Sequence, residues 1–100
     1  RDSSSASIAA CGMLEMIKYM EKEEAQIYKR YAEQLLKSLY DNYAVKDPEI
    51  SNGLVLHSTY SNHSPYNTCN HCGVDECNSW GDYFYMEALT RLSKDWVLYW

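Results

Sequence analysis

The stretch from residue 6 to residue 17 constrains the fold most, because it has a helical pattern and is apolar on nearly every side. Only Ser7 and Glu15 interrupt it. A helix that is apolar all round is buried all round, so we expect neighbours on several of its sides. Asp2 and the serines that follow it can cap the first backbone N–H groups. The pattern therefore predicts a buried helix over residues 2–20.

A second helix of another kind is predicted over residues 22–43. Its apolar residues recur at spacings of three and four, which gives one apolar stripe and one charged face. The turn between the two helices, around Tyr19 to Glu21, is short. We therefore expect an antiparallel helical hairpin. A buried helix beside an amphipathic helix is typical of a two-layer helical barrel, although a helical bundle also fits.

Residues 44–78 show no helical period and are expected to form a long loop. Asp47-Pro48 ends the helical region, since a proline disfavours the helical conformation of the residue before it. Residues 53–57 are the one candidate strand. A loop of this length inside a compact domain is usually either functional or disordered, and its tyrosines and histidines favour function.

A third helix is predicted over residues 79–93. Ser79 and Asp82 have the spacing of a capping box, with Ser79 as the first cap. The aromatic tail after this helix is expected to dock on a neighbour through Trp96 and Trp100. The sequence thus predicts an all-α chain that forms part of one domain, with at most a short β-strand.

Charge and composition restrict the partners. The net charge is −5 and no long run of Lys or Arg occurs, which argues against nucleic acid and anionic membranes. No apolar run reaches the roughly 18 residues of a membrane helix. The chain begins at Arg1 in a helix-like pattern, as expected of a piece of a longer protein. One cysteine in an apolar helix and three in a loop favour a reducing cytoplasm.

The loop holds a possible metal site. Cys69, Cys72 and Cys77, with His63 nearby, could supply three thiolates and an imidazole to a tetrahedral zinc ion. This spacing matches no complete zinc-finger pattern, and a loop with free thiols is the alternative. A non-catalytic helical module, whose Cys/His loop binds zinc or a partner protein, is therefore one candidate function.

The same loop could bind a sugar or an anion. Ser61 and Ser64 offer hydroxyl donors, yet serine is also a common loop residue. His57 could contact a ligand or be a satisfied core histidine. The acids Glu15, Glu49, Asp75 and Glu76 are not paired locally with another catalytic-looking group. The residues alone therefore predict a helical fragment with a polar loop, and no reaction.

Three segments in order resemble unsaturated glucuronyl hydrolases, glycoside hydrolase family 88. They are DSSSASIAACGMLEM at 2–16, GLVLHSTY at 53–60 and WGDYFYMEALTRL at 80–92. The resemblance implies the C-terminal quarter of an (α/α)6 barrel, in which residues 1–100 are the closing part of one catalytic domain. The unsaturated rhamnogalacturonyl hydrolases are a related alternative, but the Trp-Gly-Asp-Tyr-Phe segment favours the glucuronyl branch.

The resemblance also implies a function and a cellular location. Such enzymes are cytoplasmic bacterial glycosidases, without a cofactor, that remove the unsaturated uronic acid from lyase-generated oligosaccharides. An aspartate protonates the vinyl-ether double bond, water adds to the neighbouring carbon, and the hemiketal collapses. The family's two catalytic aspartates precede this chain, and Asp2 and Asp82 do not replace them. The isolated chain is therefore expected to be inactive and, with a buried helix uncovered, to self-associate.

The substrate-binding residues implied by the resemblance are Ser61, Ser64 and Tyr66. They fall on a Ser-x-x-Ser-x-Lys motif with which family members contact substrate sulfate. Tyr66 replaces the lysine and brings no charge, so a preference for sulfated substrates is in doubt. The cysteine-rich segment 69–77 is not part of the family pattern.

Overall fold

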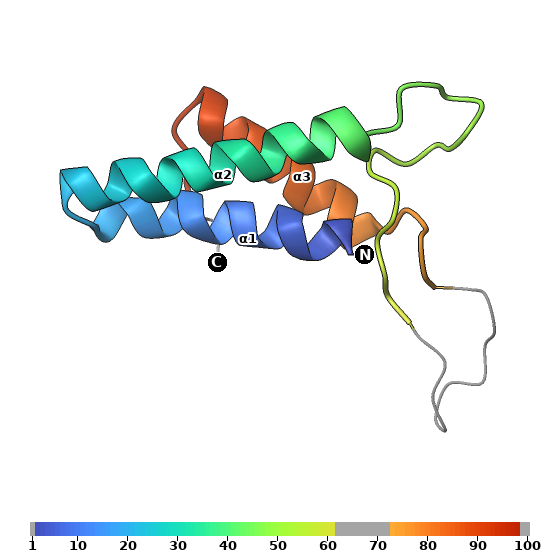
Figure 1. Ribbon diagram of the computed structural model, residues 1–100, viewed down its shortest axis with the longest axis horizontal. Helices are drawn as coiled ribbons and strands as arrows, with labels where there is room; N and C mark the ends of the chain where they lie inside the picture. Colours follow the sequence, from blue (N-terminus) through green and yellow to red (C-terminus); the bar gives the residue numbers. More distant parts are fainter. Residues whose placement is uncertain (1, 62–72, 99–100) are drawn as a thin grey trace.

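The computed structural model describes residues 2–61 and 73–98. Its helices are α1 (Ser3–Met16), the 3-10 helix η1 (Ile17–Tyr19), α2 (Lys22–Asn42) and α3 (Ser79–Ser93). Helices α1 and α3 run in the same direction, and α2 runs antiparallel to both (Figure 1). The prediction of an all-α chain is confirmed. Within the described ranges, no helix combines the length and the apolarity needed to cross a membrane.

Helix α1 packs against both other helices, and the core lies along these two contacts. The side chains that form the core are buried and mostly small or aliphatic. They are Ala10, Cys11 and Leu14 of α1, Ala32, Leu36 and Leu39 of α2, Val55, and Tyr85 and Ala88 of α3. Alanines in all three helices let the backbones approach closely. Most of the helical stability comes from burying these faces rather than from intrinsic propensity.

Within the described residues, helix α1 has one exposed face, as the sequence predicts for a chain taken apart from the rest of its domain. Ile8 and Met16 are 43% and 39% exposed. A side chain added at Gly12 would meet nothing within 4 Å. These three positions are spaced by four residues and lie on one helix face. The physical reason is that the described residues supply two helical neighbours, which cover two faces.

The start of α3 also differs from the prediction. Asn78, not Ser79, is the N-cap, and its Oδ1 accepts the Gly81 N–H at 2.7 Å. Ser79 is the first residue of the helix. The expected capping box does not form because the Asp82 carboxylate accepts N–H groups from the loop instead. At α1, Asp2 is the N-cap, as its sequence suggests.

The candidate strand at 53–57 is not a strand. Within the described part of the loop, β pairing consists of two isolated antiparallel bridges, Ala44 to Val55 and Ser58 to Glu76. The first bridge consists of hydrogen bonds from the Val45 and Leu56 N–H groups to the Leu54 and Tyr43 carbonyls. The N–H groups of Leu54 and Val55 bond to Asp82 instead of to another strand. The loop is thus held by side chains of a helix rather than by a sheet.

The aromatic tail folds back onto the helices. The Arg91 guanidinium lies 5.2 Å from the centre of the Trp96 ring, a cation–π contact. Lys18 Nζ donates a hydrogen bond to the Trp96 carbonyl at 3.3 Å. Trp100 lies outside the described residues.

Candidate functional site

The N-termini of the parallel helices α1 and α3 lie together at the end of the molecule that carries the loop (Figure 1). The loop segment 54–59 crosses this end and bonds to both helices. We call it the strap. Because the first N–H groups of a helix lack internal partners, each helix start carries side chains suited to hydrogen bonding. In this chain those side chains also fasten the strap.

Asp82 fastens the strap to α3. Its two carboxylate oxygens accept the N–H groups of Leu54 and Val55, each at 3.0 Å. Val55 is fully buried, so its N–H would otherwise lack a partner. The carboxylate also lies in the first turn of α3, where the helix dipole favours negative charge. Asp82 is therefore a structural anchor with both oxygens engaged.

Asp2 and Ser3 fasten the strap to α1. Asp2 Oδ1 accepts the N–H of Ser4 at 3.1 Å and that of Thr59 at 3.3 Å. The Ser3 N–H donates to the His57 carbonyl at 3.0 Å. Ser3 Oγ and Ser58 Oγ share a buried hydrogen bond of 2.9 Å. The serine-rich start of the sequence is thus used to join α1 to the strap.

The pKa of Asp2 is lowered from an ordinary 3.8 to about 2. Partial burial opposes this shift, and hydrogen bonds from the Ser4 and Ser5 hydroxyls and from backbone N–H groups outweigh it. The pKa of Glu15 is also lowered, by hydrogen bonds from Lys18 and Arg91. A general acid at neutral pH needs a raised pKa. Neither carboxyl is suited to donate a proton.

Gly81 allows the two helix starts and the strap to meet. A Cβ on this residue would lie 2.7 Å from Ser58 Oγ, 2.8 Å from Asn78 Oδ1 and 3.2 Å from Ser4 Cβ. These distances are shorter than ordinary van der Waals contact, so only glycine fits without movement. In the Trp-Gly-Asp sequence, Gly81 therefore allows the close packing of the two helix starts, and the next residue, Asp82, holds the strap.

Beyond the strap, two arms of the loop pair with each other. We call residues 57–61 and 73–76 the loop stem. Ser58 and Glu76 exchange two backbone hydrogen bonds, of 2.8 and 3.2 Å. The Gly73 carbonyl accepts the N–H groups of Tyr60 at 2.8 Å and Ser61 at 3.1 Å. Gly73 has a φ of +80°, which glycine adopts without strain. The Ser61 backbone, in the first arm, is thereby bonded to the second arm.

Tyr60 of the stem forms an aromatic pair with Trp80 of α3. The rings of Tyr60 and Trp80 meet edge to face with centroids 6.1 Å apart, and both side chains are about half exposed. Exposed aromatic faces with nearby hydroxyl groups suit a ligand that has both apolar and polar surfaces. The described residues of this region therefore present half-exposed aromatic rings beside the hydroxyl group of Ser61.

Few of the sequence-predicted site residues can be placed. Ser61 is half-buried in the stem. Ser64, Tyr66, His63, Cys69 and Cys72 lie outside the described residues, so their assigned roles stay predictions. Among the described residues, no group of His, Cys, Asp and Glu is arranged to hold a metal ion. The zinc site therefore also stays a prediction.

The structure also gives partners to residues whose contacts the sequence could not show. Cys77 Sγ lies 3.3 Å from Ser51 Oγ, close to the Gly53 backbone. Asp75 has no local partner in the sequence, yet its Oδ1 lies 2.9 Å from His57 Nδ1. His57 is thus half-buried rather than in the core, and its Nδ1 has a partner. The one available signal for Asp82 was its place in a first helical turn, which also suits a simple cap.

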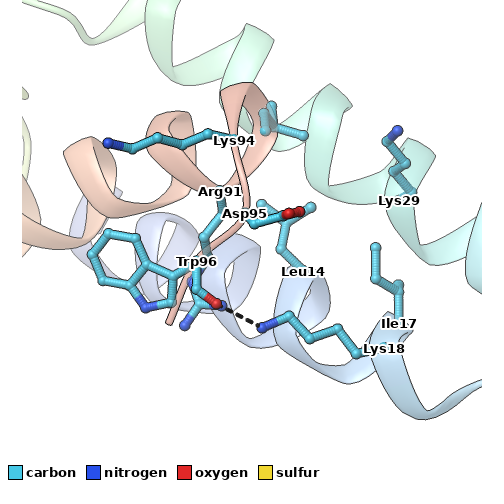
Figure 2. A pocket seen from close by; sticks show the side chains of 9 residues that line it. Leu14, Ile17, Lys18, Lys29, Arg91, Lys94, Asp95 and Trp96 are labelled. Atoms are coloured by element: carbon cyan, nitrogen blue, oxygen red, sulfur yellow. Dashed lines mark hydrogen bonds between the residues drawn. The ribbon is translucent and has the colours of Figure 1, made fainter. Parts of the chain in front are cut away.

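A pocket of about 190 Å³ lies where the last turns of α1 and α3 meet the tail (Figure 2). The cationic side chains that line it are Lys18 of η1, Lys29 of α2, Arg91 of α3 and Lys94, and two of them are already paired. Lys18 pairs with Glu15, and Arg91 pairs with Glu15 and Glu87. The Lys18 hydrogen bond to the tail crosses this region (Figure 2). The pocket is a gap beside the docked tail and does not adjoin the strap.

The sequence was compared with protein families and with characterised proteins. No family model matches it. Over its whole length the chain is 45% identical to the unsaturated chondroitin disaccharide hydrolase of Streptococcus pneumoniae. It is 32% identical, again over its whole length, to the unsaturated glucuronyl hydrolase of a Bacillus species. The chain spans about a quarter of the length of these curated relatives, 24% and 26% respectively.

Solved structures give the same similarity. A variant of the Streptococcus agalactiae unsaturated glucuronyl hydrolase superposes with a TM-score of 0.85 at 42% identity, covering 100% of this chain and 27% of that one. Another glucuronyl hydrolase variant, described together with the sugar dGlcA-Glc-Rha-Glc, superposes with a TM-score of 0.79 at 32% identity. It covers 94% of this chain and 24% of that one. The helices thus have the arrangement of about a quarter of an α/α barrel.

Proposed function

Because the whole chain is homologous to part of the unsaturated glucuronyl hydrolases, glycoside hydrolase family 88, we propose that it is the C-terminal portion of such an enzyme. Homology over every part of the chain, including the strap and α3, is the observation that carries this proposal. The parallel helices α1 and α3 would be neighbouring inner helices of the barrel, and α2 would belong to its outer layer. The strap would then lie at one mouth of the barrel.

The proposed substrate is an oligosaccharide that ends in an unsaturated uronic acid. The names of the relatives support this, since one acts on an unsaturated chondroitin disaccharide and another is named with dGlcA-Glc-Rha-Glc. The proposed reaction adds a proton to one carbon of the vinyl-ether double bond and water to the other. The resulting hemiketal opens by breaking its ring C–O bond, which leaves a hemiacetal at the anomeric carbon. Collapse of this hemiacetal breaks the glycosidic C–O bond and releases the remaining sugar as an alcohol. It differs from displacement by paired carboxylates at the anomeric carbon.

The catalytic carboxyl groups are proposed to lie outside this chain. Asp2 supports this assignment because its pKa of about 2 keeps it ionised at neutral pH. Asp82 supports it because both of its oxygens accept backbone hydrogen bonds. This chain would contribute binding groups instead, with Ser61 at the edge of the substrate. Ser64 and Tyr66 complete the proposed binding set, and the uncharged Tyr66 should weaken any preference for sulfated sugars.

The rest of the barrel is the proposed partner of the exposed face of α1. Ile8, Gly12 and Met16 form an apolar surface that a further helix could cover. An isolated chain would leave this surface in water, so we propose that it self-associates. Sedimentation of the isolated chain as a monomer at all concentrations would contradict this part.

We also propose that the enzyme is bacterial and cytoplasmic, in line with its bacterial relatives and with the free thiols of Cys11 and Cys77.

The direct test uses a full-length protein that contains this chain. Incubation with an unsaturated chondroitin-type disaccharide should remove the ultraviolet absorbance of the double bond. The corresponding saturated disaccharide is the matched control and should not be cleaved. Ser61→Ala should mainly raise KM, since it removes a binding group rather than a proton donor. Cleavage of both sugars at similar rates, or of neither, would contradict the proposed reaction.

A further inference from the structure

Two described residues other than glycine have a left-handed backbone, and their side chains contact each other. His57 has a φ of +63° and Asp75 has a φ of +60°. His57 Nδ1 lies 2.9 Å from Asp75 Oδ1. Left-handed conformations are unfavourable for L-residues other than glycine, although His, Asn and Asp tolerate them best. Such strain persists where surrounding contacts fix it, and it is common at functional sites.

The contact joins the two arms of the loop stem at its base. His57 belongs to the first arm and Asp75 to the second. The backbone hydrogen bonds of Ser58 with Glu76 lie next to it, followed by those from Tyr60 and Ser61 to Gly73. The His57–Asp75 contact therefore adds a side-chain connection to an otherwise short backbone pairing.

His57 also connects the stem to two helices. Its carbonyl accepts the Ser3 N–H at the start of α1. Its ring meets the Tyr43 ring, at the end of α2, edge to face with centroids 5.6 Å apart. The next side chain, Ser58, is fully buried against Ser3. The imidazole thus lies on the side of α2, away from the junction of the inner helices α1 and α3.

We propose that His57 and Asp75 are positioning residues, which fix Ser61 and the Tyr60–Trp80 aromatic pair for substrate binding. This inference rests on the function proposed above. The two residues act through the stem and do not touch the sugar. Losing the contact should therefore reduce the fraction of molecules in which Ser61 and the aromatic pair are placed for binding, which raises KM. The proton transfer, which determines kcat, should be little affected.

The test uses His57→Gly, Asp75→Gly and the double variant in the full-length protein. Glycine accepts a left-handed backbone, so these changes remove the contact without adding strain. We expect each single variant to raise KM for the unsaturated disaccharide by roughly three- to tenfold, with kcat changed less than about twofold. The double variant should raise KM by less than the product of the two single effects, because the contact between the two residues can be lost only once. Glu49→Gln, which removes an exposed carboxylate from the same loop outside the stem, should leave both constants unchanged.

Several outcomes would overturn the proposal. An unchanged KM with a lower melting temperature would mean a merely structural contact. KM increases that multiply in the double variant would mean that the residues act separately. If the wild-type protein cleaves no unsaturated sugar, the proposed function fails, and the positioning role is then judged by hydrogen exchange of the Tyr60 and Ser61 amides. Faster exchange in both single variants, but not in Glu49→Gln, supports the role, and unchanged exchange overturns it.

Discussion

The close approach at Gly81 predicts that Gly81→Ala destabilises the protein. In an ordinary helix, replacing glycine by alanine gains about 1 kcal/mol. Here the new Cβ would lie 2.7 Å from Ser58 Oγ and 2.8 Å from Asn78 Oδ1. Neither oxygen is free to move, since Ser58 is fully buried and bonded to Ser3, and Asn78 caps α3.

The size of the effect follows from these contacts. Overpacking costs about 1–3 kcal/mol, and losing an N-cap costs about 1 kcal/mol. After subtracting the helix gain, we expect the free energy of unfolding to fall by about 1–3 kcal/mol. For a unit of this size, each kcal/mol lowers the melting temperature by roughly 4–8 °C.

The matched control is Gly12→Ala. Gly12 lies in the middle of α1, where an added Cβ meets nothing within 4 Å. In the isolated chain this change should raise the free energy of unfolding by about 0.5–1 kcal/mol. Thermal unfolding followed by circular dichroism, at one protein concentration because self-association shifts the transition, would measure both variants. Shifts of the same sign, or stabilisation by Gly81→Ala, would refute the close packing described for the junction.

Three further predictions concern single side chains. Asp82→Asn should lower the free energy of unfolding by about 1–3 kcal/mol in urea titrations, because an amide offers one acceptor oxygen to two backbone N–H groups. An unchanged urea midpoint would show that Asp82 does not hold the strap. Asp2 should stabilise the fold above its ordinary pKa of 3.8 and lose this effect as the pH falls from 3.8 to about 2. Asp2→Asn should therefore reduce the acid sensitivity, and identical acid profiles would contradict this. Burial and the nearby Glu87 carboxylate raise the pKa of Cys11 to about 12, so Cys11 should react with a thiol reagent more slowly than Cys77, as mass spectrometry of labelled peptides would measure. Equal labelling rates in the folded protein would contradict the buried position of Cys11.

The helices could be predicted because their signals are local. The stripe of α2 and the capping residue Asp2 depend on neighbours within a few positions. The choice between Asn78 and Ser79 as the cap of α3 could not be made this way, since both residues suit the position. A contact 27 residues away in sequence, from Val55 to Asp82, makes the carboxylate unavailable for a capping box.

The candidate site was harder to predict for the same reason. His57 and Asp75 are 18 residues apart, and no periodicity relates two arms of an irregular loop. Composition identified the loop as polar and aromatic but could not show which acid is paired. The sequence predicted that α1 would be uncovered in the isolated chain, but it could not show which face of α1 this would be. An apolar pattern indicates that a face needs a partner but does not say whether this chain supplies it.

The most direct test of the central claim is to divide a full-length protein into this chain and the remainder, and to assay the pieces apart and together. If this chain completes a barrel whose catalytic carboxyl groups lie elsewhere, neither piece alone should consume an unsaturated disaccharide, and the mixture should recover turnover. A version of the mixture with Gly81→Ala in this chain should recover less. Turnover by the isolated 100-residue chain would contradict the account, because its described carboxylates Asp2 and Asp82 would then need a catalytic role that their hydrogen bonds oppose.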